Sequence, residues 1–420
     1  MTEKVDVLVI GGGIVGVCAA HYLAGRGRQV ALVEQGEIAS GSSYGNAGLI
    51  VPSHCTPLAA PGVLASGLKW MLDPESPFYI KPRLDLDLIK WLLKFTAHCT
   101  DAHVRYAIPV VRDLSNASLA LFDQLSVLGF DFGYERRGLL LIYKTEEGFR
   151  YGVEEAHVLA KAGVTSKTLD ALEVCALEPA VRPGMAGAVY FSMDAHLNPA
   201  EFVRGLARFV ESKGVRIHAN TAVTGIEKAG RRIETVQTTN GDFQPSEVVV
   251  AAGAWSPLLA RSLKLRVRVP IQPAKGYSIT VKRPAAYPVI PMLLGESRVA
   301  VTPMDSAGGP ILRFAGTLEL AGMDLSINQR RVDAMRRAAR NYLVEMGELE
   351  TIEVWGGLRP CTPDGLPIVG RSASCDNLTI AAGHAMIGIS LGPVTGKLVA
   401  QIICGEKADV DLKPLRVERF

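Results

Sequence analysis

Residues 5–34, VDVLVIGGGIVGVCAAHYLAGRGRQVALVE, constrain the fold more than any other part of the chain. A run rich in β-branched residues at 5–10 predicts a buried parallel strand, 14–25 predicts a helix, and 29–33 predicts a second strand. Between the first strand and the helix lies a G-x-G-x-x-G pattern formed by Gly11, Gly13 and Gly16. This order indicates a Rossmann-like βαβ unit within an α/β fold.

Each part of this unit has a physical role in holding a dinucleotide. The first glycines allow a tight turn and let backbone N–H groups approach a pyrophosphate, while the third lets the helix pack closely on the strand. The helix N-terminus favours negative charge, and Glu34, 18 residues after Gly16, can accept hydrogen bonds from ribose hydroxyls. The unit does not distinguish FAD from NAD. Its predicted cofactor-binding residues are Gly11, Gly13, Ile14, Val15, Gly16, Glu34 and Gln35.

Composition narrows the class of protein. A chain of 420 residues suggests two or three domains, and 45 basic against 42 acidic residues is too balanced to argue for nucleic acid as a partner. No apolar stretch of about 20 uncharged residues occurs, and the N-terminus enters a strand without a signal-like segment. The seven cysteines are scattered without a CxxC pair, and the histidines lack ligand spacing. We therefore expect a cytoplasmic protein with reduced thiols and no metal.

The segment that follows Glu34, IASGSSYGNAGLIVPS, is small, hydroxylated and glycine-rich, which suits a backbone lying flat against a ligand. Here the chain resembles the D-amino-acid oxidase superfamily of flavoproteins, in which a Ser/Thr-rich loop ending in NAG touches the flavin. Residues 46–72 resemble the bacterial D-amino-acid dehydrogenases in particular. The resemblance implies FAD as the cofactor, and the positions that match the flavin loop are Ser42, Ser43, Asn46, Ala47 and Gly48.

Residues 196–256 return to the pattern of the cofactor-binding part. A helix is expected over 199–213, a short strand over 215–218, a turn at Asn240-Gly241 and a strand over 247–253. In flavoproteins with a two-dinucleotide fold, such a strand ending in A-x-G closes over the FAD. The additional cofactor-binding candidates are Val223, near the adenine, and Ala252 and Gly253.

The stretch WGGLRPCTPDGLPIVG, residues 355–370, places Arg359 among apolar and glycine-rich residues. A buried, unpaired charge costs several kcal/mol, so Arg359 needs a partner. In the superfamily that the chain resembles, GLRP-type passages carry the arginine that binds the substrate carboxylate, and planar bidentate pairing explains the use of Arg rather than Lys. A structural salt bridge to a local carboxylate is the alternative.

Residues 377–405 predict a strand, a glycine turn and a helix that starts near Pro393. A helix N-terminus directed at the flavin pyrimidine would stabilise the negative charge of reduced flavin. The N–H donors expected at this turn are those of Gly388, Ile389, Ser390, Leu391 and Gly392.

The expected fold class is mixed α/β, with a Rossmann-like FAD-binding domain and an interleaved substrate domain built on an antiparallel sheet. The FAD-binding domain is assigned to 1–85, 192–268 and 345–420, and the substrate-binding domain to 86–191 and 269–344. Within the latter, LDLDLIKWLLKFTAHC predicts either a core-facing helix with solvated lysines or an interfacial helix at a membrane.

The resemblance implies amine oxidation in which the amino acid is held by its carboxylate and a hydride passes from its α carbon to flavin N5. Such a reaction depends on positioning and electrostatics rather than on a catalytic triad. Besides Arg359, three residues are candidates for the catalytic site: Tyr277 in IQPAKGYSITV, His384 beside the flavin turn and His54 after the NAG loop. An ordinary sheet tyrosine and a structural histidine are the alternatives for Tyr277 and His384.

The two ends of the chain point to different substrates. Residues 46–72 resemble D-amino-acid dehydrogenases, while GHAMIGISLGPVTGK resembles the branches that oxidise glycine, sarcosine and hydroxyproline. D-proline or cis-4-hydroxy-D-proline, oxidised to a cyclic imine, would satisfy both ends. The alternatives are a glycine or sarcosine oxidase that uses oxygen, and a non-catalytic FAD subunit of a larger complex. The expected electron acceptor is a quinone, another respiratory-chain component or oxygen, and peripheral contact with a membrane and a partner subunit stay open.

Overall fold

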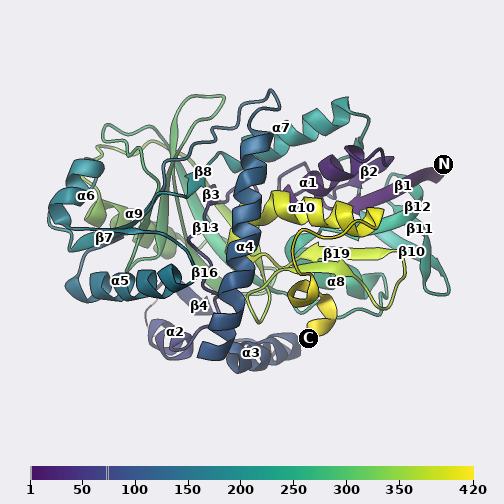
Figure 1. Ribbon diagram of the computed structural model, residues 1–420, viewed down its shortest axis with the longest axis horizontal. Helices are drawn as coiled ribbons and strands as arrows, with labels where there is room; N and C mark the ends of the chain where they lie inside the picture. Colours follow the sequence, from purple (N-terminus) through teal and green to yellow (C-terminus); the bar gives the residue numbers. More distant parts are fainter. Residues whose placement is uncertain (1, 72, 74) are drawn as a thin grey trace.

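The structure, a computed structural model, describes residues 2–71, 73 and 75–420. Two large β-sheets lie side by side, helices cover both, and one long helix crosses between them (Figure 1). Leu72, the last residue of the stretch that resembles D-amino-acid dehydrogenases, lies outside the described residues. The mixed α/β fold expected from the sequence is confirmed.

The first sheet, on the right in Figure 1, carries the predicted βαβ unit. Its eight strands are β1 (Thr2–Ile10), β2 (Val30–Val33), β9 (Arg216–His218), β10 (Val223–Ala229), β11 (Arg232–Thr238), β12 (Gly241–Val250), β18 (Ile368–Arg371) and β19 (Leu378–Ala382). The strand order is β10-β11-β12-β1-β2-β9, with β19 beside β12 and β18 beside β19. β1 runs parallel to β2 and β12, as a Rossmann-like unit requires.

The second sheet, on the left in Figure 1, is mainly antiparallel. Its nine strands are β4 (Phe78–Ile80), β5 (Leu139–Tyr143), β6 (Lys167–Leu169), β7 (Gly187–Phe191), β13 (Gln272–Lys282), β14 (Met292–Leu294), β15 (Val299–Met304), β16 (Ile311–Leu320) and β17 (Thr351–Cys361). The order is β17-β13-β16-β15-β14-β5-β7-β6, with β4 beside β16. A two-stranded ladder joins β3 (Leu49–Ile50) to β8 (Ala195–His196) between the two sheets.

Helices of two groups cover the sheets. Those beside the first sheet are α1 (Ile14–Ala24), α7 (Pro199–Ser212), α8 (Ser256–Ser262) and α10 (Gly388–Cys404), and those beside the second are α2 (Val63–Met71), α3 (Leu86–His98), α5 (Glu146–Lys161), α6 (Ala171–Leu177) and α9 (Gln329–Tyr342). Short 3₁₀ turns cover Gly253–Trp255, Ala385–Ile387, Lys413–Leu415 and Val417–Arg419.

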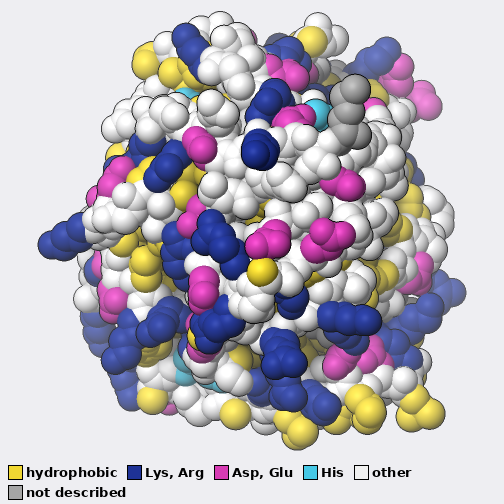
Figure 2. Space-filling model, turned by 90° about the vertical axis from the view of Figure 1, so that its right-hand side faces the viewer, with side chains coloured by type: hydrophobic (Ala, Val, Ile, Leu, Met, Phe, Trp, Pro, Cys, Tyr) yellow, Lys and Arg dark blue, Asp and Glu magenta, His cyan; other side chains and the backbone are white. Residues whose placement is uncertain are grey.

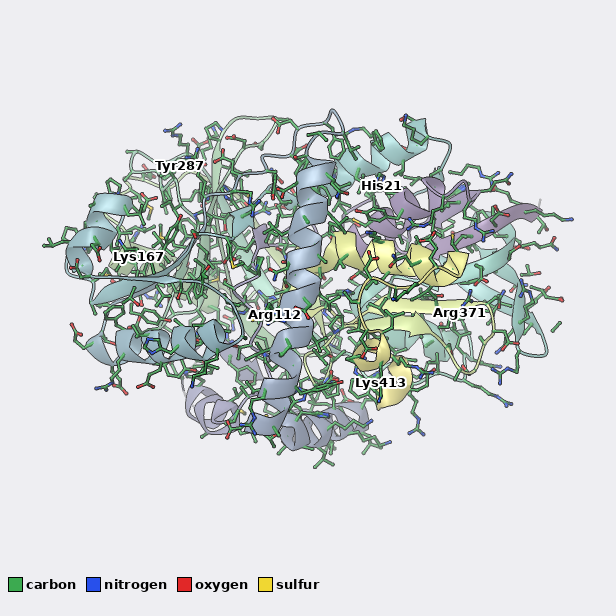
Figure 3. All side chains as sticks on the ribbon, viewed as in Figure 1. His21, Arg112, Lys167, Tyr287, Arg371 and Lys413 are labelled. Carbon is green, nitrogen blue, oxygen red and sulfur yellow. The ribbon has the colours of Figure 1, made fainter. Side chains whose placement is uncertain are left out.

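The long helix α4 (Asp101–Leu125) connects the two groups. Its C-terminal half contributes Leu114, Phe122 and Leu125 to the apolar core that also contains α1, α7 and α10. From its middle, Arg112 reaches the end of α5 and donates to the Ala162 carbonyl at 2.5 Å (Figure 3). The expectation that 86–191 belongs wholly to the substrate domain is therefore wrong for this half of α4, because its apolar face is buried in the FAD-side core.

Strand pairing differs from the expected domain boundaries at two further places. β17, within the range assigned to the FAD-binding domain, pairs with β13 along its whole length and belongs to the second sheet. β4, also within that range, pairs with β16. The remaining boundaries stay a prediction.

Helix α10 starts at Gly388, so the expectation that it starts near Pro393 is wrong. Pro393 lies in its second turn, and the 3₁₀ turn Ala385–Ile387 leads directly into the helix. The segment Ala385–Cys404 is the one described helix that is long and apolar enough to cross a bilayer, judged by length and composition. About 72% of its apolar window is buried inside the protein, which fits a core helix.

Close contact between α1 and α10 depends on two glycines of α10. A Cβ on Gly392 would overlap the side chain of Ile14, and one on Gly396 would lie 2.5 Å from the backbone carbon of Cys18. Since helix backbones cannot approach to this distance past a side chain, both positions require glycine. The N-terminus of α10 is thereby held beside that of α1.

We predict that Gly396→Val lowers the free energy of unfolding by about 3 kcal/mol, because the added side chain must push α10 away from α1. Urea denaturation followed by circular dichroism measures the change. Ala97→Val, on the exposed side of α3, is the matched control and should cost only about 0.5 kcal/mol of helix propensity. Equal losses in the two variants would contradict the close packing of α1 on α10.

Candidate functional site

The glycine turn after β1 has the geometry of a dinucleotide-phosphate site. Gly11 has a φ of +119°, and a Cβ there would lie 2.5 Å from the Ala251 carbonyl oxygen. A Cβ on Gly16 would overlap the Gly11 carbonyl. Gly13 precedes the first turn of α1, where Ile14 and Val15 are buried. The turn therefore leaves backbone N–H groups at the helix N-terminus, as the FAD pyrophosphate requires.

The loop of residues 42–48, called the flavin loop below, lies beside the glycine turn that follows β1. Ser43 is buried, and its hydroxyl accepts a hydrogen bond from the Ile14 N–H at 3.1 Å, at the first turn of α1. The Ser42 hydroxyl donates to the Leu358 carbonyl in β17. The flavin loop thus lies between the first turn of α1 and the second sheet, and its contact with the flavin stays a prediction.

Hydrogen bonds hold the end of the flavin loop in one conformation. Gly48 has a φ of +73°, and its N–H donates to the Asn46 Oδ1 at 2.9 Å. The Gly48 carbonyl accepts from Leu197 at 2.9 Å, and a Cβ on Gly48 would overlap the Leu197 carbonyl. Ala47 lies between these two fixed residues, so its backbone is fixed as well.

Glu34 lies at the end of β2, but its carboxylate already binds the backbone. Its Oε2 accepts from the Gly12 N–H at 2.7 Å and its Oε1 from the Gly36 N–H at 2.9 Å. The contact with Gly12 helps to fix the glycine turn, a role that the sequence analysis missed. Contact with the ribose stays a prediction for Glu34, as it does for the exposed Gln35 beside it.

Two further segments complete the cofactor side. The Thr221 N–H donates to the Glu34 carbonyl at 2.7 Å, which brings the start of β10 at Val223 beside the end of β2. After β12, the Ala251 N–H donates to Ile10 at 2.8 Å, so the passage through Ala252 and Gly253 lies against the glycine turn. The expected closing of this passage over the FAD stays a prediction.

The first turn of α10 meets the continuation of the flavin loop. The Ser390 hydroxyl is buried and accepts from the Val51 N–H at 3.1 Å. Gly388, Ile389, Leu391 and Gly392 lie beside it at the start of α10, so the structure brings the five residues named as donors to one place. Because FAD has a phosphate end and a flavin end, the N-termini of α1 and α10 offer one favourable position for each.

Arg359 lies near the end of β17, on the face of the second sheet that also carries Trp355 and Gly357. A Cβ on Gly276 of the neighbouring strand would overlap the guanidinium of Arg359, and a Cβ on Gly357 or Gly45 would overlap the Trp355 indole. These glycines make room for the Arg359 guanidinium and the Trp355 indole themselves, which lie against the sheet and, at Gly45, against the flavin loop. Arg359 is partly buried, and burial lowers the pKa of its guanidinium.

The guanidinium of Arg359 binds backbone carbonyls. Its Nη1 donates to the Thr317 carbonyl at 2.5 Å and its Nη2 to the Gly316 carbonyl at 3.3 Å. Among the described residues, no carboxylate forms an ion pair with it, so the salt-bridge alternative fails there. Thr317 has a φ of +63°, which is strained for a β-branched residue and is found where function requires it. Asp364, in the same motif, pairs with Arg419 at 2.7 Å.

Tyr277 points to the opposite face of the sheet, so the expectation that it reaches the substrate is wrong. It follows Gly276 in β13, and successive side chains of a strand point to opposite faces. Its hydroxyl accepts from the Asn328 N–H at 3.2 Å and contacts the Ser326 carbonyl at 3.4 Å. Its ring is buried in the core that contains α9. The alternative of an ordinary sheet tyrosine is the correct one.

The two histidine candidates differ in their surroundings. His384 is buried, its Nε2 lies 2.8 Å from the Thr395 hydroxyl, and burial lowers its pKa to about 4. His384 is therefore neutral near pH 7. Its ring nitrogen is already hydrogen-bonded to Thr395 of α10, which favours the alternative of a structural histidine. His54 is partly buried after the flavin loop, and burial lowers its pKa against the opposing charge of Glu155. The structure does not place either histidine in contact with Arg359.

Arg313 is a residue of this site that the sequence analysis missed. It lies in β16 on the same face as Arg359, two strands away from β17, and donates to the carbonyls of Tyr44 and Asn46 in the flavin loop at 3.0 Å each. A charged residue inside the apolar strand ILRFAG was the available signal. The argument applied to Arg359, that a buried charge needs a reason, would have found it.

We predict that Tyr277→Phe lowers the free energy of unfolding by about 1 kcal/mol, the usual contribution of one hydrogen bond, and leaves the KM for the oxidised substrate within a factor of two of the original value. Denaturant titration and steady-state kinetics check the two parts. A tenfold rise in KM with unchanged stability would contradict this and indicate that Tyr277 contacts the substrate.

Comparison with known proteins agrees with this arrangement. The DAO family, described as FAD dependent oxidoreductase, matches residues 6–402. A D-amino acid dehydrogenase of Neisseria meningitidis serogroup C is 31% identical over 421 residues, and one of Methylobacterium radiotolerans is 33% identical over 426 residues, each with 99% of both chains covered. Glycine oxidase from Bacillus cereus ATCC 14579 superimposes with a TM-score of 0.75 at 25% identity, over 96% of each chain. L-proline dehydrogenase from P. horikoshii has the same fold, with a TM-score of 0.76 at 21% identity over 100% of this chain and 98% of that one. The chain belongs to the DAO family of FAD dependent oxidoreductases.

Proposed function

We propose that this FAD-dependent enzyme oxidises D-amino acids, and that its preferred substrates are D-proline and cis-4-hydroxy-D-proline. The observation that carries amino-acid oxidation is Arg359. Its guanidinium has only carbonyl partners among the described residues, and β17, the strand that carries it, contacts the flavin loop. A carboxylate is the partner that this group lacks, and every amino acid has one.

The described residues can orient such a substrate without acid–base chemistry of their own. Arg359 can bind the carboxylate in a bidentate manner while Thr317 and Gly316 keep its guanidinium in place. Bound FAD supplies the acceptor for the hydride from the α carbon, and the substrate also loses its N–H proton to become an imine.

Sequence similarity is the basis for proposing a substrate that is D-configured and cyclic. The relatives that match over the whole chain are D-amino acid dehydrogenases. The turn GHAMIGISLGPVTGK resembles instead the branches that act on glycine, sarcosine and hydroxyproline. A D-configured cyclic secondary amine is a substrate that agrees with both resemblances. The proposed product is a pyrroline carboxylate, and the proposed acceptor is a quinone or another component of the respiratory chain.

Anaerobic mixing of the purified protein with single amino acids tests the substrate. The set contains D-proline, cis-4-hydroxy-D-proline, D-alanine, L-proline, glycine and sarcosine, and the flavin absorbance near 450 nm is the readout. We expect fast bleaching by the two cyclic D-amino acids and slow or no bleaching by the others. Fast bleaching by glycine or sarcosine, with peroxide formed in air, would favour an oxidase like the Bacillus cereus enzyme. Bleaching by none would favour a non-catalytic subunit.

In the same experiment Arg359→Met tests the carboxylate site. Loss of a charged, bidentate contact should lower kcat/KM about 10²- to 10³-fold while FAD stays bound. Arg371→Met is the matched control, because Arg371 pairs with Glu247 at 2.7 Å between β18 and β12, away from the flavin loop (Figure 3). A similar loss in both variants, or no loss in Arg359→Met, would contradict the role of Arg359.

We also propose that the enzyme works in the cytoplasm, docked on the inner face of the cell membrane through α3. This helix has two apolar stripes. Leu88, Trp91 and Phe95 are buried, and Trp91 donates to the Cys361 carbonyl at 2.9 Å, so the tryptophan faces the core. A second stripe points outward, where Leu86 is 72% and Leu93 68% exposed. Ile89 of this stripe and Leu84, just before the helix, are also exposed.

Basic residues adjoin the outward stripe and favour an anionic surface as its partner. Arg261 pairs with Asp87 of α3 at 2.7 Å, and the exposed Lys264, Arg266 and Arg268 follow it in the chain. Figure 2 shows the side of the molecule that lies on the right in Figure 1. Lys and Arg side chains are frequent over its lower half, and apolar side chains lie along its lower edge. In Figure 1, α3 lies at this lower edge. Apolar insertion combined with positive charge is the pattern of interfacial binding to anionic lipid.

Sedimentation with lipid vesicles tests this docking. We expect binding to vesicles that contain phosphatidylglycerol, weaker binding to pure phosphatidylcholine, and at least a tenfold loss for Leu86→Glu combined with Leu93→Glu. Leu172→Glu is the control, since Leu172 is 82% exposed on α6 at the far side of the molecule (Figure 1). Binding that does not require the α3 leucines, or no binding to either vesicle, would contradict the proposal.

A further inference from the structure

Arg313 joins the flavin loop to the second sheet. Its side chain is only 4% exposed, and three hydrogen bonds hold it. Nη1 donates to the carbonyls of Tyr44 and Asn46 at 3.0 Å each, and Nε donates to the Thr280 hydroxyl at 3.1 Å. Two of the three acceptors belong to the flavin loop, so Arg313 fixes how this loop lies over the sheet.

The charge of Arg313 stays uncompensated at short range. Among the described residues, no carboxylate forms an ion pair with it, and its three acceptors are neutral. Burial lowers its pKa to about 10, against the weaker opposing influence of Tyr44 and Glu353, so the side chain is still positive near pH 7. A carboxylate at this place would cancel the charge, whereas carbonyl groups only solvate it. Glu353 of β17 lies opposite Thr280 on the same face and is partly exposed. A buried positive charge, opposed in part by Glu353, therefore lies behind the flavin loop.

Such a charge distinguishes the two redox states of a bound flavin. Two-electron reduction of FAD at neutral pH adds negative charge to its ring system, and a buried cation stabilises added negative charge more than an exposed one because water screens it less. We propose that Arg313 is a positioning residue that both anchors the flavin loop and raises the reduction potential of the bound FAD. The inference does not depend on which amine is oxidised.

Three substitutions separate the two proposed effects of Arg313, which are the anchoring of the flavin loop and the electrostatic effect of its charge. Arg313→Gln keeps an amide that can donate to the loop carbonyls but removes the charge. Arg313→Lys keeps the charge but lacks the planar fork that reaches several acceptors at once. Arg204→Gln is the matched control, because Arg204 lies 5.3 Å from the Tyr44 ring on the partly exposed side of the same loop, where solvent screens its charge.

The midpoint potential of the bound FAD, measured by anaerobic reduction against reference dyes, is the main readout. For Arg313→Gln we expect the preference for reduced over oxidised FAD to fall about 10- to 100-fold, which equals roughly 30–60 mV for a two-electron couple. Arg313→Lys and Arg204→Gln should each shift it less than threefold. The dissociation constant of FAD, measured by fluorescence, should rise about tenfold in Arg313→Lys because the loop is less well anchored.

Two outcomes would overturn the inference. If Arg313→Gln loosens FAD without lowering the potential, the residue has a structural role only. If Arg204→Gln lowers the potential as much as Arg313→Gln does, general charge rather than burial at this place sets it. Should Arg313→Gln fold poorly, Thr280→Val provides the second route: it removes one acceptor and frees Nε, and a potential that stays unchanged or rises supports the inference, while a fall like that expected of Arg313→Gln contradicts it.

Discussion

The hydrogen bonds that fix the flavin loop are the constraint on which the rest of the site depends. A small, glycine-rich segment has many conformations, so it takes one only when neighbouring groups satisfy its polar atoms. Within the loop, Ser43 is bonded to α1, and the carbonyls of Tyr44 and Asn46 are bonded to β16. In the residues that follow it, Val51 is bonded to α10 and Ser53 to the buried Asp194. The loop therefore fixes the phosphate side, the flavin side and the second sheet relative to one another.

Glycines act in two different ways around this loop. At Gly16 and Gly396 the nearest neighbour of an added Cβ is backbone, so glycine lets two elements approach and holds the helix N-termini in place. At Gly276 and Gly357 the neighbour is a side chain, so glycine lets the Arg359 guanidinium and the Trp355 indole lie against the sheet. The first group builds the cofactor site, and the second holds Arg359 and Trp355 close to the strands of the second sheet.

Local pattern predicted the cofactor half well because its information is contiguous in the sequence. Residues 5–34 contain a strand, a turn, a helix and a strand in order, and each has its own periodicity. The substrate half depends on register between distant strands. Tyr277 and Arg359 both lie in motifs that suggested substrate contact, yet they face opposite sides of one sheet. The register of β13 on β17, with Ala274 opposite Arg359 and Tyr277 opposite Gly356, decides which side each faces, and a single sequence does not reveal it.

Arg313, which is buried, and Arg359, which is partly buried, lie on the same face and are held in the same way. Each donates to backbone carbonyls, and neither has a carboxylate partner among the described residues. Carbonyl groups lower the cost of burying a guanidinium but leave its net charge in place, whereas a carboxylate would lower the cost and remove the charge together. Where this face meets the flavin loop it therefore carries two guanidinium charges, opposed in part by the partly exposed Glu353 of β17. Both molecules that the site must hold carry negative charge, one as a carboxylate and the other on reduction, and this shared requirement explains why the charge is solvated here rather than neutralised.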